Sequence, residues 1–291
     1  MKKLTVLLPI ALFALPAGAE EIDKTLDAAS DGHVDVSNIA GEVTIRGWSR
    51  NEVEVTGELG RNVEKLIFER DGDKITIKVK VPRKGGRGIE SDLHVQVPEG
   101  SSIDVGTVSA DIDVSDVSGE QSLSTVSGDV NTEAFGNDIS AEAVSGDVEV
   151  SGQGRNIEIS ASTVSGDVTL FRVGGVVEAG SVSGDVIVDE GSFERVGLET
   201  VNGEIVFHAE LRTGGKLNVE TVNGDVDLKF TEKVSGRYDI DTFNGDIRNC
   251  YGPKAERTSK YTPGWELSFE EGDGNARITV STLNGDISIC D

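Results

Sequence analysis

Val164-Ser165-Gly166-Asp167 is the stretch that decides the fold, because close copies of it recur along most of this 291-residue chain. Each copy reads V-S-G-D or V-N-G-D/E, and successive central glycines are 18, 20, 18, 19, 21, 21 and finally 40 residues apart. Short units that repeat in one direction are typical of a β-solenoid, in which the copies stack around a common core. Ala110 replaces the glycine in a degenerate first copy, and the glycines of the others are Gly128, Gly146, Gly166, Gly184, Gly203, Gly224, Gly245 and Gly285.

Apolar residues take fixed positions around the central glycine, which we number zero. Positions −2, +2 and usually +4 are apolar, as are positions −7 and −5; one copy shows this with Val164, Val168 and Leu170, then Ile159 and Ala161. Even and odd positions point to opposite faces of a strand, so the chain must turn to bury both sets. We expect two short strands that meet at a corner near −4 and −3. Residue −2 and the glycine then face inward, where a side chain at position zero would collide with the opposite wall.

The repeat predicts an all-β fold: a single-stranded, parallel β-helix-like solenoid of about nine coils, at ~4.8 Å per coil. Residues 20–100 are predicted to form a β-rich N-terminal cap that covers the first open edge, because Ile75, Ile77 and Val79 alternate as in a strand. Gly41-Glu42 resembles a decayed copy within it. Residues 101–291 are the repeat region, with an insertion at about residues 251–264.

Residues 1–19 have the features of a signal peptide. Lys2 and Lys3 precede an apolar run over residues 4–15, and Ala17-Gly18-Ala19 provides the small residues of a cleavage site. The run is too short to span a bilayer, which disfavours the alternative of an uncleaved anchor. We predict cleavage after Ala19, no transmembrane segment in the mature chain, and a location in the periplasm or on the cell surface.

The charge balance limits the choice of partner. The chain has 52 acidic and 27 basic residues, a net charge of −25. Loss of Lys2 and Lys3 leaves 25 basic residues and a net charge of −27. Such a surface repels nucleic acids and anionic lipids. The two cysteines, Cys250 and Cys290, both lie at position +5 of their copies, and in an exported protein they predict a disulfide between adjacent coils.

An acidic residue at position +1 of each copy is the main candidate site. Stacking would align these residues in an outward column, where calcium is one conceivable ligand and capping of each residue's own turn is the role that we favour. The column contains Asp129, Asp147, Asp167, Asp185, Glu204, Asp225, Asp246 and Asp286. A second outward ladder is expected from the hydroxyls at −3, namely Thr125, Thr163, Ser181, Thr200, Thr221 and Thr242.

Motifs for catalysis are lacking in the sequence. His33, His94 and His208 are scattered and share no spacing with a nucleophile or a metal motif. The basic loop at residues 82–88 lacks the Gly-Lys-Ser/Thr ending of a P-loop. Carboxylates are abundant, but the repeat itself supplies them, so no catalytic pair stands out.

The V-S-G-D and V-N-G-D copies, with the segment from Ala40 to Trp48 (AGEVTIRGW), resemble a known bacterial family. This is the "putative adhesin" family of domains of unknown function, envelope proteins built of β-strand repeats, and the likeness covers nearly all of residues 30–291. The resemblance implies a right-handed parallel β-helix-like fold and an extracytoplasmic location. It supplies no catalytic motif.

We therefore expect an exported, non-catalytic envelope protein, an adhesin-like binding or scaffold module that presents repetitive acidic strand faces to an envelope glycan or protein. The alternatives are a β-helix polysaccharide lyase or hydrolase, and an envelope-stress accessory protein. The sequence leaves open the ligand, the display at the surface or in the periplasm, and the oligomeric state.

Overall fold

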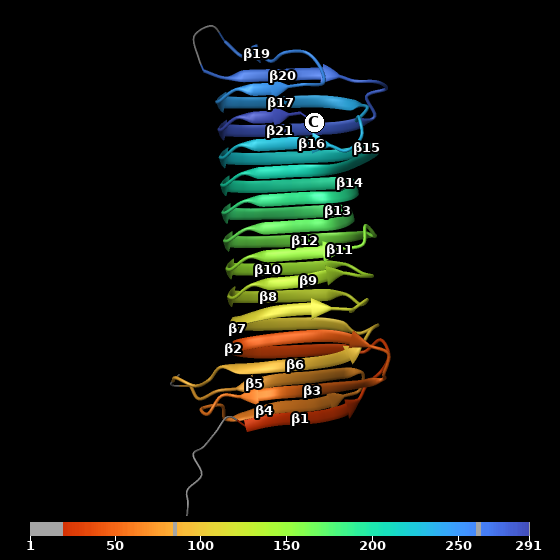
Figure 1. Cartoon of the computed structure of the whole chain (residues 1–291), viewed down its shortest axis with the longest axis vertical. Helices are drawn as coiled ribbons and strands as arrows, with labels where there is room; N and C mark the ends of the chain where they lie inside the picture. Colours follow the sequence, from red (N-terminus) through yellow and green to blue (C-terminus); the bar gives the residue numbers. More distant parts are fainter. Residues whose placement is uncertain (1–19, 84–85, 260–262, 291) are drawn as a thin grey trace, which may run out of the picture.

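The computed structural model describes residues 20–83, 86–259 and 263–290, and these residues form strands that stack into one tall column (Figure 1). The predicted signal peptide lies outside the described residues. The strands are β1 (Glu20–Asp27), β2 (His33–Trp48), β3 (Glu52–Leu59), β4 (Lys65–Asp71), β5 (Lys74–Lys80), β6 (Ser91–Pro98), β7 (Ser102–Ser115), β8 (Gln121–Ser127), β9 (Val130–Ala134), β10 (Ile139–Ser145), β11 (Val148–Gly152), β12 (Asn156–Ser165), β13 (Val168–Ser183), β14 (Val186–Asn202), β15 (Ile205–Asn223), β16 (Val226–Phe230), β17 (Gly236–Asn244), β18 (Ile247–Asn249), β19 (Glu256–Arg257), β20 (Trp265–Glu270), β21 (Ala276–Asn284) and β22 (Ile287–Ile289).

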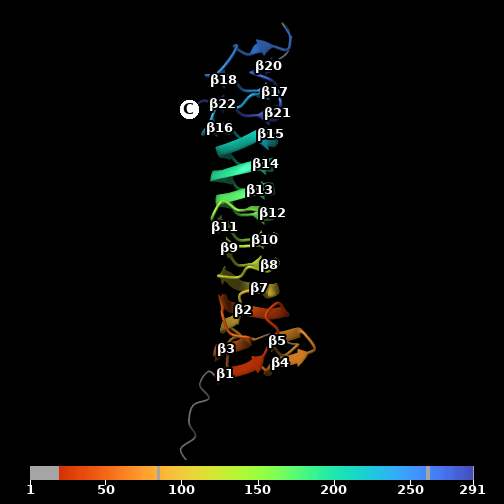
Figure 2. The same cartoon turned by 90° about the vertical axis from the view of Figure 1, so that its right-hand side faces the viewer.

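Equal positions of successive repeats pair in parallel. β10 lies between β8 and β12, so that Ile139 pairs with Gln121 and Ile159. β11 lies between β9 and β13, so that Val148 pairs with the equivalent valines of its neighbours. Each coil thus supplies one strand before its glycine and one after it, and Figure 2 shows how narrow the resulting stack is. The described residues contain no helix, and the all-β prediction is confirmed. The number of coils stays a prediction.

The corner of each coil lies at the V-S-G-D motif itself. In one coil Ile159 and Thr163 are buried before the corner and Val168 after it, whereas Val164 is 46% exposed. The prediction that residue −2 faces inward is therefore wrong, as is the placement of the corner near −4 and −3. Odd positions from −7 to −3 are buried. After the turn at Ser165-Gly166-Asp167, the even positions +2 and +4 are buried instead.

The repeated glycine is required by the neighbouring coil rather than by the opposite wall, which corrects the expectation from sequence. A Cβ atom on Gly146 would lie 1.9 Å from the carbonyl oxygen of Gly128, and one on Gly184 would lie 1.9 Å from that of Gly166. Real Cβ atoms do not approach an oxygen so closely. Glycine therefore allows these corners to stack at strand spacing, whereas the first copy stacks on β2 with Ala110 at this position.

The last repeat is inserted between two earlier ones. β21 pairs in parallel with β15 on one side and with β17 on the other, and β22 lies between β16 and β18. The central glycines thus stack in the order Gly224, Gly285, Gly245. Beyond β17 the edge is covered by β20 and then β19, both antiparallel, at the top of Figure 1. The 40-residue gap in the repeat therefore holds the covering strands.

Cys250 and Cys290 meet because their two coils are neighbours. Their Cα atoms lie 5.0 Å apart and their sulfurs form a disulfide. The predicted disulfide is confirmed. It closes a segment of 40 residues that includes β19, β20, β21 and β22.

The other end of the stack has a similar inserted strand. β2 pairs in parallel with β5 and β6 on one side and with β7 on the other, so the decayed copy at Gly41 is itself part of the stack. Below β5 and β6, the strands β1, β3 and β4 pair antiparallel (bottom of Figure 1). Their antiparallel pairing sets this end apart from the parallel coils above it.

Candidate functional site

Residue −2 of each coil forms an exposed row that we call the apolar stripe. Its members are the large apolar side chains most exposed in the described residues, with exposed fractions of 39% to 49%. The stripe follows the stack as Val108, Val126, Val144, Val164, Val182, Val201, Val222, Leu283 and Phe243.

The buried hydroxyl at −3 explains why these side chains point outward. Thr163 Oγ1 donates a hydrogen bond to the carbonyl oxygen of Gly146 at 2.9 Å, and Thr200 Oγ1 donates to that of Gly184 at 3.0 Å. A buried hydroxyl favours such a partner, and the neighbouring coil supplies it for Thr163 and Thr200, although not for Thr221. Since residue −3 faces the core, residue −2 must face solvent.

The predicted outward ladder of hydroxyls is therefore wrong. Each member is at most 7% exposed, because the strand alternation places position −3 on the same face as the core residues at −7 and −5. The six residues are Thr125, Thr163, Ser181, Thr200, Thr221 and Thr242.

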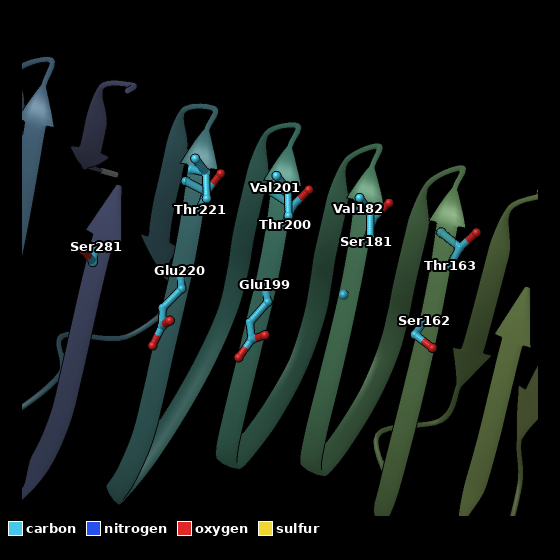
Figure 3. Close-up of a pocket in the computed structure, with 12 residues that line it drawn as sticks. Ser162, Thr163, Ser181, Val182, Glu199, Thr200, Val201, Glu220, Thr221 and Ser281 are labelled. Atoms are coloured by element: carbon cyan, nitrogen blue, oxygen red, sulfur yellow. The ribbon is translucent and has the colours of Figure 1, made fainter. Parts of the chain in front are cut away.

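A shallow hollow of about 630 Å³ lies along the middle of the stripe. Val182, Val201 and Val222 line it together with Glu199 and Glu220 of the same strands. Figure 3 shows the two carboxylates side by side on neighbouring strands, below the arrowheads in that view. Glu199 and Glu220 are register partners in adjacent coils, and neither makes an ion pair with another described residue. The hollow thus joins an aliphatic row to uncompensated negative charge.

The acidic residues at +1 link one coil to the next. The backbone N–H of Asp147 donates to Oδ1 of Asp129 at 2.9 Å, and the N–H of Asp167 donates to Oδ1 of Asp147 at 2.8 Å. These carboxylates therefore accept from the turn of the neighbouring coil, rather than from their own turn as expected. The same bond joins Asp111 to Asp129, Asp167 to Asp185, Asp185 to Glu204, Asp225 to Asp286, and Asp286 to Asp246.

Two carboxyls of this region have raised pKa values. Partial burial raises the pKa of Glu204, and the negative charges of Asp185, Asp225 and Asp227 add to the effect. Partial burial likewise raises the pKa of Asp113, although a hydrogen bond from the amide of Asn131 opposes the shift. Like charges one strand spacing apart disfavour ionisation.

The histidines are not brought together. The ring of His33 contacts the hydroxyl of Ser102 at 3.1 Å, and His208 Nε2 lies 3.2 Å from Asp227 Oδ2, in strands far apart in the stack. Within residues 20–83, 86–259 and 263–290, no three His, Cys, Asp or Glu side chains are grouped as a metal site would require.

Two observations bear on membrane insertion and on the cellular compartment. Across the described part of the chain, no helix is long and apolar enough to cross a bilayer. The Cys250–Cys290 disulfide points to an extracytoplasmic protein, because thiols stay reduced in the cytoplasm.

Solved structures match the chain only at low similarity. One is a "putative adhesin" from Bacteroides fragilis NCTC 9343, with a TM-score of 0.45 and 10% identity over 94% of this chain and 99% of the other. Another is a "putative lipid binding protein" from Parabacteroides distasonis ATCC 8503, with a TM-score of 0.41 and 13% identity over 93% and 97%. A "putative adhesin" from the same strain has a TM-score of 0.35 and 11% identity over 94% and 98%.

No curated protein matches the chain. The model of one family, described as Toastrack DUF4097, matches twice, over residues 69–180 and 177–290, and so covers more than half of the sequence. The resemblance drawn from the V-S-G-D and V-N-G-D copies is confirmed at the level of the family. This chain belongs to the Toastrack DUF4097 family.

Proposed function

We propose that this protein is an exported, non-catalytic binding module of the cell envelope, which docks a protein partner along the apolar stripe. The observation that supports the proposal is the stripe itself. Large apolar side chains stay exposed in coil after coil, although a polar residue at −2 would face solvent at no cost to the core. A rigid row of this kind suits an extended contact rather than a reaction at one point.

The chemistry of the surface favours a protein over a glycan. Branched aliphatic side chains bury other apolar side chains well, whereas sugars need aromatic faces and hydrogen-bonding groups, and Phe243 is the one aromatic ring in the stripe. Glu199 and Glu220 beside the stripe add a charge preference. The partner surface is therefore apolar and flanked by Lys or Arg, which would neutralise these carboxylates.

The finer organisation belongs to the same proposal. A signal peptide at residues 1–19 would deliver the chain to the periplasm or the cell surface. Residues 20–100 would serve as a cap, and residues 101–291 would form the repeat region of about nine coils. The acidic residues at +1 would hold the coils together rather than bind calcium, since their oxygens accept backbone N–H groups.

The test is binding of the purified mature protein to outer-membrane, peptidoglycan and polysaccharide fractions, with and without calcium. One variant replaces Val182, Val201 and Val222 with Ser. The control variant replaces Ile187 and Val206 with Ser, because these half-buried side chains lie at +3 on the other strand of the coil. We expect saturable, protease-sensitive retention by a fraction that contains protein, lost in the first variant and kept in the control. Retention that resists protease treatment of the fraction, or that survives in the stripe variant, would contradict the proposal.

A further inference from the structure

Four basic side chains lie in register at the C-terminal part of the stack, at position −8 of four consecutive coils. Arg195 pairs with Lys216, Lys216 with Arg277, and Arg277 with Arg237. All four are exposed. We call this row the cationic ladder. The order of these residues in the stack differs from their order in the sequence. β21 is inserted between β15 and β17, so Arg277 lies between Lys216 and Arg237.

The ladder is scarcely neutralised by the protein. Arg237 lies 3.5 Å from Glu270, and no ion pair among the described residues involves Arg195, Lys216 or Arg277. Like charges placed directly opposite each other in a sheet are destabilising. In a chain of net charge −25, which offers carboxylates in excess, four aligned and largely unpaired cations are unexpected.

A hollow of about 360 Å³ opens beside the ladder. Arg195 and Lys216 line it together with Arg212, Gly214 and Glu194. The extra residues before Lys216 form a bulge in β15, because Phe193 and Arg195 of the preceding coil pair with Leu211 and Lys216. Arg212 is held in place, because its guanidinium donates to Ser192 Oγ at 3.0 Å and to Glu194 Oε1 at 3.2 Å. The hollow therefore presents two unpaired cations, Arg195 and Lys216, beside Arg212, whose charge is offset by Glu194.

The acidic surroundings do not cancel the ladder. The carboxylates of the hollow at the apolar stripe lie at position −4, four residues further along the same strands, which is about 13 Å away. This distance exceeds the screening length of about 8 Å at physiological salt. Asp239 and Glu270 lie beside Arg237, so an anion at the ladder interacts mainly with Arg195, Lys216 and Arg277.

We propose that the cationic ladder binds a linear acidic polysaccharide whose anionic groups follow one another along the chain. The cations recur every ~4.8 Å along a straight line of about 14 Å, which suits an extended chain of sugars that each bear a carboxylate or phosphate. An acidic peptide in extended form presents side chains on one face only every ~6.6 Å, and so loses register with the ladder. This site is distinct from the apolar stripe and goes beyond the proposed protein-docking function.

Titration calorimetry with polygalacturonate tests the site on the full mature chain. The ladder variant carries Lys216→Gln and Arg277→Gln. The control carries Lys24→Gln and Lys78→Gln, which remove the same charge from exposed positions in β1 and β5 at the opposite end of the stack (Figure 1). We expect the ladder variant to bind at least about tenfold more weakly and the control to stay within about twofold of the unmodified protein. Raising the salt concentration should weaken the binding.

Three results would overturn the proposal: no binding of polygalacturonate, equal binding by the ladder and control variants, or equal affinity for poly-glutamate of matched charge. Thermal melting without ligand provides a second measurement. The ladder variant should melt slightly higher than the control variant, because the two have the same net charge and only the ladder variant has lost two mutually repelling neighbours. A lower melting temperature than that of the control would show that Lys216 and Arg277 stabilise the fold, and would likewise contradict the proposal.

Discussion

Gly146 shows how one residue sets the spacing of the whole stack. Its Cα passes so close to the carbonyl of Gly128 that even a methyl group has no room, and the hydroxyl of Thr163 bonds the carbonyl of Gly146 in turn. Steric demand and hydrogen bonding thus meet at one corner and repeat from coil to coil. The corner is therefore the point at which the fold is most sensitive to substitution.

Replacing Gly146 with Ala should destabilise the protein by about 3 kcal/mol or more, because the new Cβ forces two coils apart. The measurement is chemical unfolding followed by circular dichroism. Gly86→Ala is the matched control, since a Cβ there would meet nothing closer than 3.8 Å, and it should change stability by less than about 0.5 kcal/mol. Equal effects of the two substitutions would show that the corner contact is not limiting.

Glu204 should make the protein more stable at acidic than at neutral pH. Its pKa is raised in the fold, so the folded state holds a proton that the unfolded state has lost between the ordinary and the raised pKa. Stability therefore falls as pH rises through this window. Glu204→Gln should raise the melting temperature near neutral pH, by less than ~1 kcal/mol in free energy, because the side chain is largely exposed. The difference should vanish below about pH 4. A destabilised variant at neutral pH would contradict the assignment.

At the scale of the element, the acidic column acts as a set of hydrogen-bond acceptors between coils. Asp147→Asn keeps an oxygen for the N–H of Asp167 and removes a charge, so it should be neutral or slightly stabilising. Asp147→Ala leaves that N–H without its acceptor and should cost about 1 kcal/mol. Urea unfolding of both variants, with and without calcium, distinguishes a hydrogen-bonding role of the column from a calcium-binding role. If Asn and Ala are equally harmful, and only the unmodified protein responds to calcium, the column is a metal site.

The disulfide fastens the inserted last coil. Breaking it by Cys250→Ser with Cys290→Ser removes a crosslink across 40 residues, and by loop-closure entropy this should cost about 4 kcal/mol. The loss should be local. Hydrogen exchange should speed up first in β17, β18, β21 and β22, whereas β8 to β12 should keep their protection. Uniform loss of protection along the stack would show that the coils unfold as one unit.

The sequence revealed those features of the elements that depend on local periodicity. The repeat, the all-β class and the pairing of the cysteines follow from spacing alone. The outward direction of residue −2 was not predicted, because Val164 is as apolar as Val168. The unbroken alternation of β12 and the hydrogen bond of the buried Thr163 place Thr163 inward and Val164 outward. The insertion of β21 could not be inferred either. The disulfide requires only that the copies of Cys250 and Cys290 be neighbours, and it does not reveal which of the two lies nearer the end of the stack.

The whole molecule is long and thin and has a net charge of −25, so its carboxylates repel one another along the length of the stack. Raising sodium chloride from about 0.02 M to about 0.5 M shortens the screening length from roughly 20 Å to about 4 Å and should raise the melting temperature. The same titration near pH 4, where many carboxylates are protonated, should give a smaller rise. A melting temperature that is independent of salt at neutral pH would show that local pairing already offsets the repulsion.

The inserted strands also bear on how the chain is made. A polypeptide emerges from its amino end, yet β17 has no parallel neighbour until β21 has been synthesised, and β2 has to wait for β5, β6 and β7. Vectorial coil-by-coil growth is therefore impossible at both ends. A nascent chain that stops before residue 276 leaves β17 with only the antiparallel β20 beside it, so β17 can join the parallel stack only after β21 has been synthesised.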